Sequence, residues 1–124
     1  ILWGAAAKTH INQLFISQKK IIRSISNVGY YSHTQPLFRQ LRLYKLEDIY
    51  FIEVAKFMYK YTNNSLPAPL SDIFTYTKNV HSHGTRQNSH YRPPSINKQT
   101  SVHSILHNGP IVWNNILLEI KSIH

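Results

Sequence analysis

The chain has no cysteine among its 124 residues, only four glycines and only five carboxylate side chains. Without cysteine, a disulfide scaffold, a thiolate zinc site and a thiol nucleophile are all excluded. The glycines stand far apart, so the glycine-rich loop that cradles phosphate in nucleotide-binding enzymes is absent as well. The longest apolar run is far shorter than the roughly 20 residues that a membrane-spanning helix needs. We therefore expect no disulfide, no thiol chemistry and no membrane partner.

The scarcity of carboxylates bears directly on catalysis. Polymerase-type phosphoryl transfer needs at least two carboxylates that share divalent metal ions. The only aspartates, Asp48 and Asp72, are far apart in the sequence. Glu47 and Asp48 are neighbours, but they open a predicted helix, where the helix dipole favours negative charge. The sequence therefore predicts no catalytic residue, no metal site and no cofactor for this chain alone.

Two weaker residue patterns remain as alternative metal-binding sites. Asp72 with Glu119 and Lys121 has the acidic-then-E-x-K spacing of metal-dependent nucleases, although the pattern around Glu119 is helical and such nucleases use a strand there. His103 and His107 are four residues apart, which places both on one helix face, as in zinc proteins. No cysteine completes a ligand set, so surface and packing roles are favoured for these histidines. A small metal-dependent nuclease is thus the least favoured hypothesis.

Positive charge is what the chain has in excess. Fourteen lysines and arginines stand against five acidic residues, a net charge of +9 with a pI near 9.9. Such a balance favours an anionic partner, most often nucleic acid, because binding releases counterions from the phosphates. The alternative is a basic surface that serves only solubility.

Apolar residues recur with helical spacing over much of the chain, and strand signals are weak. The fold class predicted is all-α, a small bundle of three to five amphipathic helices. The clearest helix covers residues 8–26, with one polar slot at Gln18 and a left-handed cap at Gly29. A short helix with Thr34 as N-cap and a third helix over residues 47–61 follow. The stripe of the first helix that we expect to pack inward is Ile11, Leu14, Phe15, Ile22 and Ile25.

Three segments are predicted along the chain. Residues 1–74 form a helical core, and residues 75–100 form a long irregular loop rich in His, Ser and Asn, which we expect to be the least ordered part. Residues 101–124 form a C-terminal helical segment that packs back on the core, with a turn at Gly109 and Pro110 and with Trp113 as an anchor. The chain begins and ends like a fragment, so we expect a piece of a longer protein.

Several cations lie off the apolar stripes, where phosphate contacts are expected. Lys19, Lys20 and Arg23 cluster at helical spacing, and Arg39 and Arg42 recur every three residues, a rhythm that Lys45 continues. In the loop, Tyr91 is available for base stacking beside Arg86; the alternative is that Arg86 pairs with a carboxylate of another domain. The predicted nucleic-acid-binding residues are Lys19, Lys20, Arg23, Arg39, Arg42 and Arg86.

An ordered series of short phrases runs along nearly the whole chain. They include Leu-Trp-Gly (residues 2–4), Gln-Lys-Lys-Ile-Ile-Arg (18–23), His-Thr-Gln-Pro-Leu-Phe (33–38), Phe-Met-Tyr-Lys (57–60), Leu-Pro (66–67) and a Gly-Pro before Trp-Asn (109–114). In order and spacing the series resembles the C-terminal region, after the polymerase palm, of reverse transcriptases from non-LTR (LINE-type, jockey- and CR1-like) retrotransposons.

The resemblance implies a parent RNA-directed DNA polymerase that uses Mg, and this portion as a thumb-side or C-terminal accessory segment without an active site of its own. Its implied partners are RNA and DNA, as template and primer, and the remainder of the parent polymerase. The implied location is the nucleus or a cytoplasmic ribonucleoprotein. No catalytic residue of the family falls on a position of this chain. The competing hypothesis from another class is a structural protein-interaction domain.

Overall fold

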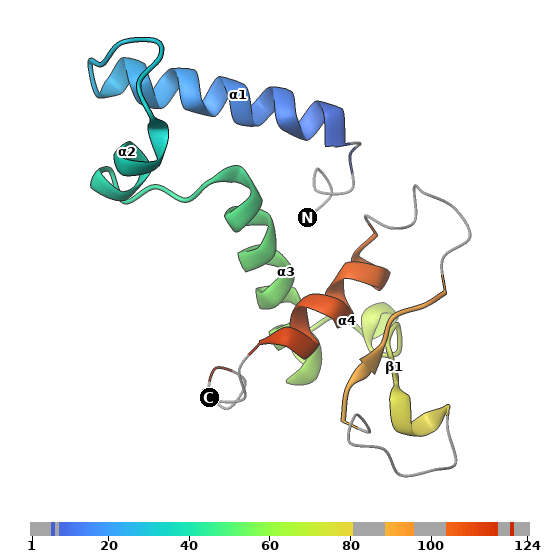
Figure 1. Ribbon diagram of the computed structural model, residues 1–124. Coiled ribbons are helices and arrows are strands. Elements are labelled where there is room, and N and C mark those ends of the chain that lie inside the picture. Colours follow the sequence, from blue (N-terminus) through green and yellow to red (C-terminus); the bar gives the residue numbers. More distant parts are fainter. Residues whose placement is uncertain (1–5, 7, 81–88, 96–103, 117–119, 121–124) are drawn as a thin grey trace.

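The structure is a computed structural model that describes residues 6, 8–80, 89–95, 104–116 and 120. Within these residues the chain forms α1 (Lys8–Ile25), α2 (Thr34–Gln40), α3 (Leu46–Thr62), the 3-10 turns η2 (Ala68–Leu70) and η3 (Thr77–Asn79), the strands β1 (Thr75–Tyr76) and β2 (Tyr91–Arg92), and α4 (Ile105–Asn115). Helix α3 joins two ends of the molecule, with α1 and α2 at one end and α4 with the strands at the other (Figure 1). Among the described residues, none of the helices combines the length and the apolar composition that a membrane-spanning segment requires.

The predicted helices are present at nearly the predicted bounds, and the helical class holds for most of the structure. The caps differ from the prediction. His33, and not Thr34, is the N-cap of α2, and its side chain makes no capping hydrogen bond. At the end of α1 the left-handed residue is Asn27, with φ of 51°, and not Gly29. Asparagine tolerates this conformation, and the N–H of Val28 closes the cap by donating to the Arg23 carbonyl at 3.1 Å.

A two-stranded antiparallel sheet lies inside the segment that was predicted to be irregular. Thr75 pairs with Arg92, and Tyr76 pairs with Tyr91. The prediction was wrong at these positions because two residues per strand are too few to give a periodic pattern. Residues 81–88 and 96–100 of the predicted loop lie outside the described residues.

The main core lies between the second half of α3, the small sheet and α4. Its buried members are Met58, Phe74, Tyr91 and Trp113, which confirms Trp113 as a core anchor. The predicted turn at Gly109 and Pro110 was wrong, because both residues are buried inside α4. A Cβ built on Gly109 would lie only 2.9 Å from Met58 Sδ, so glycine there permits the close approach of α4 to α3.

Helix α1 packs less extensively than its apolar stripe predicts. Phe15 stacks on Phe38 of α2 with ring centroids 6.4 Å apart, and Ile22 is the buried residue of α1. Leu14 and Ile25 are exposed, contrary to the expectation that both face inward. The reason is that α2 has only seven residues, so it covers a short length of α1.

Candidate nucleic-acid interface

The segment between α2 and α3 is held in place by Gln18 of α1. Its side-chain amide donates to the carbonyl of Tyr44 at 3.0 Å, and its Oε1 accepts from the N–H of Leu46 at 3.1 Å. Leu46 is the first residue of α3, and the N-cap Lys45 offers no side-chain cap. Gln18 therefore satisfies a helix-end N–H that would lack a partner. Gln18, the polar residue that interrupts the apolar stripe of α1, thus links α1 to the start of α3. We call its two hydrogen bonds, to Tyr44 and Leu46, the Gln18 clamp.

This clamped segment lines a cavity of about 390 Å³ at the junction of α2 and α3. Two arginines, Arg39 and Arg42, line it together with Lys45, and one carboxylate, Asp48, is also present. Arg42 reaches it from a left-handed backbone position with φ of 53°, where the N–H of Leu43 donates to the Phe38 carbonyl at 2.9 Å. The remaining lining residues are Gln35, Phe38, Leu43 and Tyr44. Three cations against one carboxylate give the cavity a cationic character.

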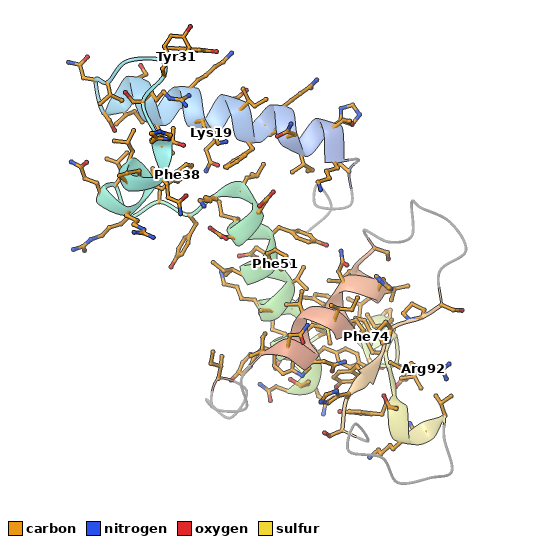
Figure 2. The ribbon with its side chains drawn as sticks, in the orientation of Figure 1. Lys19, Tyr31, Phe38, Phe51, Phe74 and Arg92 are labelled. Carbon is orange, nitrogen blue, oxygen red and sulfur yellow. The ribbon has the colours of Figure 1, made fainter. Side chains whose placement is uncertain are left out.

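The three cations of α1 that the sequence predicts as phosphate contacts are in three different situations. Lys19 is half-buried, with Nζ 4.1 Å from the centroid of the Phe15 ring, so a cation–π contact holds it (Figure 2). Lys20 is exposed. Arg23 is half-buried, and its Nε donates to the carbonyl of Ser32 at 2.9 Å. The three residues do share one helix, but only Lys20 presents its charge to solvent without such a contact.

The structure therefore groups Arg39 and Arg42 in one cavity and places Lys19, Lys20 and Arg23 along α1. Lys45, which the three-residue rhythm indicated, belongs to the cavity. Arg86 lies outside the described residues.

Tyr91 is not available for base stacking. Its side chain is 2% exposed, and its ring packs on Tyr76 with centroids 4.4 Å apart. Its hydroxyl shares a hydrogen bond of 2.8 Å with the hydroxyl of Tyr76. Burial, with this hydrogen bond, raises the pKa of Tyr91 far above its ordinary value. The prediction was wrong because the short strand β2 turns this side chain into the core.

The structure brings no alternative metal site together in the part of the chain that it describes, where no group of three potential ligands occurs. Asp72 is exposed and accepts a hydrogen bond from Ser71 Oγ at 3.2 Å. Glu119, Lys121 and His103 lie outside the described residues. His107 is within α4, and its buried Nδ1 has no hydrogen-bond partner among the described residues.

A larger cavity of about 560 Å³ lies against α3 and the end of α4 and has a different character. Its lining is mostly apolar, with Lys56 and Lys60 as its charged members; the others are Ile52, Ala55, Tyr59, Ser65, Trp113, Ile116 and Ile120. Lys56 Nζ already pairs with Glu53 at 2.8 Å, and this pairing lowers the pKa of the Glu53 carboxyl. Because this cavity is mostly apolar and one of its two lysines is already paired, the cationic cavity is the better candidate for contact with nucleic acid.

Sequence reasoning missed two features of this end of the molecule. Tyr44 was not singled out, although it lines the cavity and is exposed. Tyr30 and Tyr31 follow Gly29 and are both exposed. The sequence did contain a signal for this feature, because two adjacent tyrosines stand between predicted helices. An exposed aromatic side chain in a turn is not explained by packing and can indicate a binding role.

Comparison with known proteins gives one local similarity. The chain is 40% identical over 47 residues to the RNA-directed DNA polymerase from the mobile element jockey of Drosophila melanogaster. The match covers 38% of this chain and 5% of that polymerase, so the chain spans a small fraction of that protein's length. No protein-family model and no solved structure matches the chain. The similarity relates part of the chain to a retrotransposon polymerase, in loose agreement with the resemblance drawn from its motifs.

Proposed function

We propose that the chain is a nucleic-acid-holding accessory segment of a retrotransposon RNA-directed DNA polymerase and has no active site of its own. The observation that carries this proposal is the cationic cavity lined by Arg39, Arg42 and Lys45. The similarity to the jockey polymerase supports the kind of parent protein.

The cavity has the chemistry that phosphate binding needs. An arginine guanidinium offers donors in a planar fork that matches two phosphate oxygens, and lysine adds a compact charge. Both arginines are exposed, and neither has an acidic partner within ion-pair distance among the described residues. Tyr44 places an exposed ring beside them. Phosphate contacts of this kind position a nucleic acid without reading its sequence.

The cations of α1 extend the basic surface on the same end of the molecule. Helix α1 contacts α2 through Phe15 and Phe38, and Lys19 lies over the Phe15 ring. In this proposal Lys19 and Lys20 add phosphate contacts beside the cavity, whereas Arg23 chiefly holds the turn after α1. Arg86 remains a predicted contact.

The proposed ligand is a template–primer of RNA and DNA, and the proposed protein partner is the remainder of the parent polymerase, which would supply the Mg-binding carboxylates. The isolated chain is then expected to incorporate no nucleotide with any divalent metal.

The test is the salt dependence of binding to an RNA–DNA hybrid by the full 124-residue chain. Replacing Arg39, Arg42 and Lys45 with Gln should flatten the slope of log affinity against log salt by about 0.9 for each phosphate interaction removed, or about 2 to 3 in all. All hybrid sequences should weaken alike, because phosphate contacts carry no sequence information.

The matched control removes the same charge elsewhere, at Lys56, Lys60 and Lys78. Should both triple variants flatten the slope equally, net charge and not the cavity drives binding. An unchanged slope in the cavity variant, with the helical circular dichroism of the wild type retained, would favour the structural protein-interaction domain instead.

A further inference from the structure

Two tyrosines occupy the corner of the turn between α1 and α2. The N–H of Ser32 donates to the carbonyl of Gly29 at 3.0 Å, which makes Tyr30 and Tyr31 the central residues of the turn. Such positions normally carry Gly, Pro, Asn, Asp or Ser. Tyr30 is 65% exposed and Tyr31 is 92% exposed. Tyr31 lies at the edge of the molecule (Figure 2). No packing requirement accounts for a ring that is almost wholly in water.

The turn is held in a defined shape from α1. Arg23 Nε donates to the Ser32 carbonyl at 2.9 Å, and the guanidinium carbon lies 5.8 Å from the centroid of the Tyr30 ring. The rings of Tyr30 and Tyr31 meet edge to face, with centroids 5.2 Å apart and planes at 89°. Tyr31 is therefore presented by a supported turn, which reduces the entropy cost of binding a ligand there.

We propose that Tyr31, supported by Tyr30 and Arg23, is a stacking platform for an unpaired nucleobase. This inference rests on the proposed function, and it specifies the ligand as nucleic acid with a single-stranded segment. Proteins that hold single strands combine cations along the backbone with aromatic rings on which bases stack. Bases inside a duplex already stack on both faces, so an unpaired base in an overhang is the better ligand for this ring.

The charges around the turn favour a nucleobase over a protein surface. Arg23 lies against Tyr30, and the exposed Lys20 precedes Arg23 by three residues on the same helix. Lys20 can neutralise a phosphate that flanks a stacked base, and Arg23 holds the turn in shape. Ile21 and Ile25 are also exposed on α1, so a protein contact at this end is the competing outcome.

The experiment compares Tyr31→Ala with wild type on two probes, a blunt RNA–DNA hybrid and the same hybrid with a short single-stranded DNA overhang that contains 2-aminopurine. We expect Tyr31→Ala to weaken binding of the overhang hybrid by about tenfold or more and to leave the blunt hybrid within about twofold. Wild type should change the 2-aminopurine fluorescence, and Tyr31→Ala should not. Tyr31→Phe keeps the ring and should behave as wild type.

The matched control is Phe51→Ala, which removes another exposed aromatic side chain, from α3 (Figure 2). The stacking assignment is overturned if Tyr31→Ala binds the overhang hybrid as wild type does, or if Phe51→Ala weakens it equally. It is also overturned if Tyr31→Ala changes self-association in sedimentation and not overhang binding. The wild-type chain could bind the blunt hybrid in a salt-dependent way and bind the overhang hybrid with the same affinity. That result would refute only the stacking platform. Failure to bind either probe refutes the proposed function as well.

Discussion

At the scale of single residues, the cationic cavity depends on an arginine in an unfavourable backbone conformation. Asn27, Arg42 and Asn64 are the non-glycine residues with positive φ in the part of the chain described, and each follows the end of a helix. Each is followed by an N–H that donates back to a helix carbonyl, at 3.1 Å for Val28, 2.9 Å for Leu43 and 2.8 Å for Ser65. Asparagine accepts this conformation readily because its short polar side chain can hydrogen-bond to the local backbone, whereas the arginine side chain offers no such compensation for the steric cost of its Cβ.

Arg42→Gly should therefore raise stability while weakening nucleic-acid binding. Glycine adopts positive φ without a steric cost, so we expect the free energy of unfolding to rise by about 0.5–1 kcal/mol. The same variant loses one cavity cation. The slope of log affinity for RNA–DNA hybrid against log salt concentration should therefore become shallower by about 0.9. Urea unfolding and hybrid titration measure the two effects separately.

Arg39→Gly is the matched control for Arg42→Gly, since it removes the same charge from the same cavity. Arg39 lies inside α2, where glycine costs about 0.5–1 kcal/mol, so its effect on stability should have the opposite sign. Equal stability changes in the two variants would show that Arg42 carries no conformational strain.

At the scale of elements, the close contact of α4 with α3 depends on the absence of a side chain at Gly109. A Cβ there would lie 2.9 Å from Met58 Sδ and 3.1 Å from Phe74 Cζ. Gly109→Ala should destabilise the chain by about 1–3 kcal/mol, because overpacking outweighs the better helix propensity of alanine. Thermal or urea unfolding measures the change.

The same substitution at Gly29 is the control. A Cβ at Gly29 would lie 3.8 Å from Ser32 Oγ, an ordinary contact, and Gly29 does not have positive φ. Gly29→Ala should therefore be neutral or stabilising by up to about 1 kcal/mol. A stability loss of the same size at both positions would contradict the packing explanation for Gly109.

The buried tyrosine of the small sheet should make the free energy of unfolding depend on pH in alkaline solution. The folded state holds the pKa of Tyr91 above its ordinary value, because burial and the Tyr76 hydroxyl favour the neutral phenol. An unfolded tyrosine ionises near pH 10, so the contribution of Tyr91 to stability is complete below about pH 10 and decreases as the pH rises above it.

Tyr91→Phe should accordingly reduce the loss of stability between about pH 10 and 12, because phenylalanine has no proton to release on unfolding. Tyr31→Phe is the control, since Tyr31 is almost fully exposed. Denaturant unfolding at several pH values measures both slopes. Parallel pH profiles for wild type and Tyr91→Phe would contradict the buried neutral phenol.

The sequence predicted the helices well and their contacts less well. Particular residues show the physical reasons for this difference. Periodicity reports that a segment can be an amphipathic helix, and it located α1 and α3 closely. Periodicity does not report how much surface of the neighbouring elements is available to cover the helix. For this reason it predicts that Leu14 and Ile25 are buried, although both are exposed. Gln18 interrupts the stripe, and only the fold shows that it bonds to Tyr44 and Leu46. For the candidate site, charge spacing predicted Arg39 and Arg42 as contacts, and both line one cavity. Spacing contains no information on the turn that exposes Tyr31.

At the scale of the whole molecule, burial is unevenly distributed between the two ends of α3. The main core consists of Met58, Phe74, Tyr91 and Trp113. It lies at the end near α4, where Figure 2 labels Phe74. The other end has Ile22 and Phe38 as its buried residues on α1 and α2. The proposed interface thus lies on the part of the chain with the smaller core.

Hydrogen exchange should therefore differ along the helices of the free chain. Amides of α1 are expected to exchange through local opening, at a free energy below that of global unfolding, because Ile22 is the single buried residue that α1 contributes. Amides in the second half of α3 should exchange near the global value, since Val54 and Met58 are fully buried. Adding RNA–DNA hybrid should slow exchange in α1 and α2 and leave α3 around Met58 unchanged, because a ligand stabilises the state to which it binds. Equal protection of α1 and α3 in the free chain would mean that the two ends unfold as one unit, and the Gln18 clamp would then be the contact that couples them.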